Sequence, residues 1–192
     1  LKLIVENAMF QYPSLPKAVD NINVNMAVNS TGGSFDNTVV DISKFDFKMG
    51  GNPFSASLNV KTPMSDPNLK AKINGVLDLN MIKDVYPLEQ GTKLNGKLTA
   101  AMEIATRMSA IEKEQYESVS ASGFLQLANM TYAATDMPEV VINKAGMEFS
   151  PKFVNLSSLD VKIGKNDLQA NGKLENFIPY ILKDQTLKGQ LN

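Results

Sequence analysis

Three aspartates at regular spacing are the first candidates for chemistry in this sequence. Asp36, Asp41 and Asp46 could bind calcium, or two of them could form the acid and base of a glycosidase. A calcium loop needs a run such as D-x-D-x-D-G, which is absent from the sequence. A glycosidase needs two carboxylates about 5–9 Å apart in a cleft, and no pair here is forced together. We expect solvated strand faces and turn caps, and keep a hydrolase only as a remote alternative.

The composition removes most other catalytic classes. The chain has 192 residues with no Cys and no His, so disulfides, zinc fingers, thiol catalysis and imidazole bases are excluded. Nineteen Lys and Arg against twenty Asp and Glu give a net charge of −1, which disfavours nucleic acid as a partner. We therefore predict a non-enzymatic protein without cofactor or metal.

The two ends of the sequence suggest a piece of a longer protein. It begins at Leu1 in the middle of an alternating pattern, and no apolar run reaches the length of a membrane span. No signal peptide is recognisable. One domain, or a fragment of a repetitive protein, fits this length.

Alternating apolar and polar residues dominate the sequence and predict β-strands. In residues 43–49, Phe45, Phe47 and Met49 point to one side of a strand and the charged residues between them to the other. One wet face indicates an antiparallel sheet, and the turn signals at 31–34, 49–53, 65–68 and 164–167 predict an up-and-down meander. Helices are expected only near 80–86, 176–182 and 109–118, the last from a Ser109–Glu112 capping box.

The sequence contains an internal repeat. Segments 1–21, 39–60 and 66–74 match segments 123–143, 153–174 and 184–192. This predicts one continuous domain made of a repeat unit at 1–75, an intervening stretch at 76–122 and a second, truncated unit at 123–192. A Gly-x-Leu echo at Gly75, Gly96, Gly123 and Gly172 permits a sharp bend or close backbone approach, and repeated at one strand position it would curl the sheet along one line. The alternative is that these glycines only start strands after turns.

The apolar face of the predicted strands must contact something. A closed β-sandwich would cover it with a second sheet, packed helices would give an α+β layer, and an open curved sheet would leave an apolar-lined groove. Repeated, extendable strands favour the groove. The residues predicted to line it are Phe45, Phe47, Met49, Phe54, Leu58, Leu98, Met102, Leu159, Val161, Ile163 and Leu174.

Four rows of the sequence carry a resemblance to a known family. The rows KFDFKMGGNPFSASLNV (44–60), DPNLKAKINGVLDLNMIKDVYPLEQGTKLNGKLTA (66–100), SLDVKIGKNDLQANGKLENF (158–177) and LKGQLN (187–192) are similar to the C-terminal repetitive region of the AsmA-like family, related to TamB and the bridge-like lipid-transfer proteins. The shared feature is a strand–turn–strand cadence with L-x-G-x-L, and not a catalytic signature.

The resemblance implies a function in the cell envelope. The parent would lie in the periplasm of a Gram-negative cell, anchored in the inner membrane by a segment absent here, and would serve outer-membrane assembly and lipid transport. Its β-groove would carry phospholipid or another acyl lipid. The alternative is a closed β-sandwich, a structural or adhesin-like surface module. Edge-to-edge self-association of this piece is a further expectation.

Overall fold

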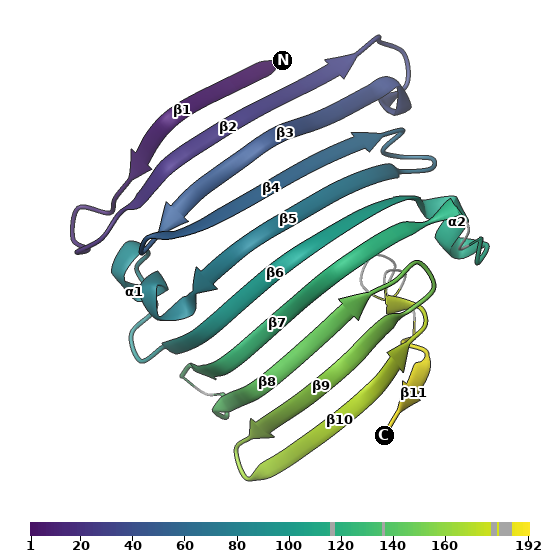
Figure 1. The fold of residues 1–192 in the computed structure, drawn as a ribbon. Coiled ribbons are helices and arrows are strands. Elements are labelled where there is room, and N and C mark those ends of the chain that lie inside the picture. Colours follow the sequence, from purple (N-terminus) through teal and green to yellow (C-terminus); the bar gives the residue numbers. More distant parts are fainter. Residues whose placement is uncertain (116–117, 136, 178–179, 181–185) are drawn as a thin grey trace.

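The computed structural model describes residues 1–115, 118–135, 137–177, 180 and 186–192. Its strands form one antiparallel eleven-stranded sheet in sequence order (Figure 1). The strands are β1 (Lys2–Phe10), β2 (Val19–Ser30), β3 (Thr38–Met49), β4 (Asn52–Lys61), β5 (Asn68–Asp78), β6 (Lys93–Arg107), β7 (Ser120–Ala133), β8 (Val140–Phe149), β9 (Val154–Ile163), β10 (Asn166–Leu174) and β11 (Gly189–Leu191). The predicted antiparallel meander is confirmed.

The predicted turns separate these strands. Residues 31–34 link β2 to β3, 65–68 lead into β5, and 164–167 span the turn between β9 and β10. Gly50 and Gly51 join β3 to β4 with φ values of 58° and 82°, a left-handed conformation that side chains with a Cβ rarely adopt. Short connections of this kind force each strand to lie beside the one before it.

The described helices are short and lie at the two ends of the strands (Figure 1). Near the predicted 80–86 helix, the 3₁₀ turn η2 (Leu79–Met81) runs into α1 (Ile82–Val85). At the other end, α2 spans Met108–Glu112. A further 3₁₀ turn, η1 (Phe35–Asn37), precedes β3. Most of the helix expected at 176–182 lies outside the described residues.

The predicted capping box is wrong. The N-cap of α2 is Arg107 and not Ser109, and the helix ends at Glu112 instead of near residue 118. The Ser109 hydroxyl donates to Asp66 Oδ2 at 2.8 Å, so it is engaged by a distant turn and does not cap its own helix. The hydrogen bond from Ser109 to Asp66 therefore takes the place of the capping interaction that the local sequence predicts.

The two repeat segments form equivalent strands. With the sequence offsets, β1 to β5 correspond in order to β7 to β11, and β6 lies between the two sets. A β-bulge in β3 between Ile42 and Phe45 recurs in β9 between Leu156 and Leu159, at the same offset of 114 residues. Asn7 and its equivalent Asn129 both have left-handed backbones, with φ of 47° and 50°.

The sheet is a single open layer, with β1 and β11 at opposite edges (Figure 1). The main contacts of each strand are with its sequence neighbours. A closed β-sandwich would need a second packed sheet, and the described strands form only one. No helix among the described residues has the length and apolarity needed to cross a membrane.

Candidate functional site: the apolar face of the sheet

Two adjacent rows of residues cross the sheet on opposite faces. Cross-strand partners in an antiparallel sheet point to the same side, so the register assigns each residue to a face. We call the first row, from β3 to β11, the apolar row: Phe47, Phe54, Gly75, Ala100, Leu125, Met147, Leu156, Gly172 and Leu191. The polar row is Asp46, Ser55, Asn74, Ala101, Phe124, Glu148, Asn155, Lys173 and Gln190.

All eleven residues predicted to line a groove lie on the face of the apolar row. Phe45 aligns with Ala56, Met49 with Asn52, and Leu58 with Ile42. The register assigns the remaining predicted residues in the same way: Leu98, Met102, Leu159, Val161, Ile163 and Leu174. We call this side the apolar face.

The side chains of the apolar face are only partly shielded from solvent. Among the predicted residues, Met49, Val161 and Leu174 are buried, whereas Phe45 is 38% exposed and Ile163 43% exposed. The other predicted residues are half-buried. No large described side chain is fully buried, which is the expected result when one layer is shielded mainly by its own neighbours.

Three phenylalanines give the apolar face an aromatic cluster at β3 and β4. The ring centroids of Phe45 and Phe47 lie 5.6 Å apart, and those of Phe47 and Phe54 lie 5.1 Å apart. Both separations are in the range in which aromatic rings attract one another. The cluster presents a broad hydrocarbon surface near one edge of the sheet.

Several glycines of this face have no room for a side chain beside the neighbouring strand. A Cβ at Gly75 would lie 2.7 Å from the Phe54 Cα, and Gly96, Gly123 and Gly172 show similar overlaps with neighbouring backbone. The predicted close approach is confirmed. The glycines do not share one line: Gly75 and Gly172 lie in the apolar row, but Gly96 and Gly123 lie in others.

Helix α2 covers one end of the apolar face. Ala110 and Ile111 of α2 pack with Val119 and with the apolar-face residues Ile104 and Ala121. Ala71 and Phe149 extend this cluster across β5 and β8. It is the main buried cluster of the described residues, and it leaves the middle of the apolar face outside it.

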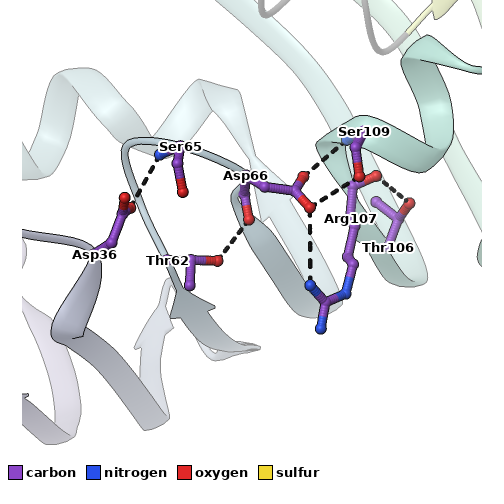
Figure 2. A network of polar contacts seen from close by, with 7 residues as sticks. All are labelled: Asp36, Thr62, Ser65, Asp66, Thr106, Arg107 and Ser109. Atoms are coloured by element: carbon purple, nitrogen blue, oxygen red, sulfur yellow. Dashed lines mark hydrogen bonds and ion pairs between the residues drawn. The ribbon is translucent and has the colours of Figure 1, made fainter.

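A polar network holds α2 in this position (Figure 2). Asp66 accepts hydrogen bonds from the Ser109 N–H at 2.9 Å and hydroxyl at 2.8 Å, and Arg107 lies 3.8 Å away. These bonds, the backbone one foremost, hold the pKa of Asp66 below its ordinary value. The Thr62 hydroxyl donates to the Asp66 carbonyl at 2.6 Å and so fixes the turn that carries the carboxylate.

The three aspartates considered for catalysis have structural partners. Asp36 accepts from the backbone N–H groups of Ser65 and Met64, both at 2.9 Å, and these bonds lower its pKa. Asp41 accepts from the Asn59 side chain at 2.7 Å, and Asp46 lies 3.6 Å from Lys44. Within the described ranges, no three acidic or other metal-ligating side chains gather at one point.

A hollow of about 640 Å³ lies mainly on the opposite face. Asp46, Ser55, Asn74 and Phe124 of the polar row line it, and Lys48 borders it. A second hollow of about 410 Å³ lies beside α2, between Met64, Leu69 and Ile111. Neither corresponds to the predicted lining as a whole, and a continuous groove on the apolar face stays a prediction.

Sequence reasoning missed several members of the apolar row. Leu125 and Met147 lie at its centre, and the alternation of Leu125, Gln126 and Leu127 was a usable signal for the first of them. Phe124 is the reverse case: it is aromatic, yet it lies on the polar face opposite Ala101 and Glu148. The adjacent pair Phe124–Leu125 cannot be assigned to faces without the neighbouring strands.

Comparison with protein-family models, with curated proteins and with solved structures found no match.

Proposed function

We propose that this chain is a lipid-binding segment of an envelope protein for outer-membrane assembly, and that its apolar face is part of a conduit for phospholipid. The resemblance of its repeats to the AsmA-like region supports this proposal. The observation that carries it is the apolar row, which continues through nine strands with no second sheet over it among the described residues.

The apolar row has the chemistry and the length that an acyl chain needs. Its side chains offer hydrocarbon without polar groups, so a lipid tail placed there loses no hydrogen bonds. Each CH₂ removed from water contributes about 0.8 kcal/mol. Nine strands at the usual spacing extend roughly 38 Å, whereas each leaflet of a bilayer has only about 15 Å of hydrocarbon.

The polar row favours a single layer with water on its other side. Asp46, Glu148 and Lys173 place charges on that face from β3 to β10. Because charged side chains resist burial, this face disfavours packing against a second apolar layer. From the two rows we infer a wall with lipid on one side and water on the other.

The test is native mass spectrometry of the chain purified without detergent from a Gram-negative host, followed by lipid extraction. Phe45→Asn changes an accessible apolar-face residue, and Phe124→Asn makes the same change on the polar face. We expect bound phospholipid in the wild type and in Phe124→Asn. Phe45→Asn should weaken binding by roughly tenfold to a hundredfold, because losing the burial of a Phe costs about 1.5–3 kcal/mol.

Circular dichroism of the same samples is the control for folding. Folded protein without phospholipid in the wild type contradicts the proposal. Equal loss of phospholipid in the two folded variants also contradicts it, because the polar face would then matter as much as the apolar face.

A further inference from the structure

Strands β7 and β1 are equivalent in the repeat, but β7 has a neighbour on both sides and β1 on only one among the described strands. In the second repeat unit, β7 pairs with β8 on one side and with β6 on the other. Its equivalent β1 pairs with β2, and no described strand lies on its outer side. Among the described strands, β1 therefore lies at an edge of the sheet, although its sequence corresponds to that of the interior strand β7.

Along this edge, the backbone of β1 has hydrogen-bonding groups that pair with no strand among the described residues. Leu1 and Val28 exchange both backbone hydrogen bonds at 2.8 Å. Since such pairs alternate along an antiparallel ladder, the N–H and C=O groups of Lys2, Ile4 and Glu6 point away from β2. A long edge with alternating apolar residues is a template for another strand.

We propose that the outer edge of β1 binds an antiparallel strand built like residues 93–101 of β6. The partner is a polypeptide with the chemistry of that segment, and the proposal does not depend on lipid binding. Transferring the β6–β7 register by the repeat offset places Leu98 of such a strand opposite Val5, and Ala100 opposite Leu3. Both pairs continue the apolar face.

One position of the partner must be glycine. In the sheet, a Cβ at Gly96 would lie 2.6 Å from the Met130 Cα, next to the left-handed Asn129. Ala8 is the equivalent of Met130 and follows the left-handed Asn7. The strand opposite this bulge therefore needs glycine where residue 96 stands.

Charge and sterics also define the register. Lys97 faces Ala128 within the sheet, but its counterpart would face Glu6, which provides an opposite-charge pair. At the start of β1, the repeat equivalent of Gly123 is Leu1. A Cβ at Gly123 would overlap the backbone of β6 at Ala101 and Met102, so the side chain of Leu1 would overlap a partner strand at this position. Pairing should therefore stop at Lys2.

Disulfide trapping tests this register, because the chain has no Cys of its own. The protein carries Val5→Cys and is mixed with synthetic peptides KLNGKLTAA in which a Cys replaces the residue equivalent to 97, 98 or 99. We expect at least tenfold more cross-linking at 98, since only that side chain would share the face of residue 5. Equal yields at the three positions would overturn the proposal.

Two further variants separate edge pairing from adventitious contact. Ile4→Pro removes an outward N–H without affecting the bonds to β2, a position where edge strands tolerate proline. We expect it to abolish trapping, as should Gly96→Val in the peptide. Trapping that survives Ile4→Pro contradicts the proposal, and so does a dimer of the chain that excludes the peptide, because a second copy would then be the occupant.

Discussion

The apolar row and the polar row cross the same nine strands one residue apart, and they differ in the chemistry of their side chains. The apolar row contains aliphatic, aromatic and glycine residues from β3 to β11. The polar row contains charges, amides and a hydroxyl, with Ala101 and Phe124 as its two apolar members. Since the same strands carry both rows, the difference follows from the alternation of residue types at a period of two.

This comparison explains why a single layer can exist without a conventional core. Buried residues concentrate under α2 and at a few strand positions, while Phe45 stays 38% exposed. Contiguous exposed apolar patches are common at interaction surfaces, and for this reason we propose lipid contact here.

The largest change in stability is expected where the apolar row has no room for a side chain. Gly75→Ala places a Cβ 2.7 Å from the Phe54 Cα and 2.8 Å from the Pro53 carbonyl oxygen. Overpacking of this kind costs about 1–3 kcal/mol or more, and the positive φ of 156° adds to it. Urea unfolding followed by circular dichroism measures the loss.

Gly32→Ala is the matched control for that substitution. Gly32 also has a positive φ, of 88°, but a Cβ there meets no atom within 4 Å. It should lose only the cost of a left-handed Ala, about 1 kcal/mol. If Gly75→Ala is no worse than this control, the close approach of β4 and β5 is not needed for the apolar row.

A smaller effect is expected where α2 covers the apolar face. Ser109→Ala removes the hydroxyl that donates to Asp66 and should destabilise the fold by about 1 kcal/mol. Fluorescence of an added apolar dye should rise in native conditions, because the end of the apolar face over β5 to β7 opens. Ser65→Ala, in the same turn network, keeps its N–H bond to Asp36 and should leave dye binding unchanged.

The smallest effect is expected in the pH dependence of stability that comes from the bonds between Asp66 and Ser109 of α2. The pKa of Asp66 is lowered from 3.8 in the folded protein, so its contribution to stability is complete above that value and is lost as the pH falls below it. Asp66→Asn should lower the melting temperature at pH 7, and the difference from wild type should shrink toward pH 3. A difference that stays constant across this range would show that the charge of Asp66 has no part in holding α2.

The sequence was a good guide wherever local pattern decides structure. Alternation placed Phe45, Phe47 and Met49 on one face, and glycine pairs such as Gly50–Gly51 marked turns, because both effects act within a few residues. It was a poor guide where contacts with residues far away in the sequence determine the conformation or the face of a residue. Ser109 matches a capping box, but its hydroxyl bonds to Asp66, 43 residues away. The face of Phe124 depends on β6 and β8 and not on its own neighbours.

Fluorescence quenching tests whether lipid lies against the apolar face and not against the polar one. The chain contains no Trp, so Phe47→Trp and Phe124→Trp each introduce a single probe, one in each row. Both proteins are mixed with phosphatidylcholine brominated in its acyl chains. We predict strong quenching and a blue shift for Trp in place of Phe47, with little change for Trp in place of Phe124. Equal quenching of the two probes, or none at position 47, would contradict it.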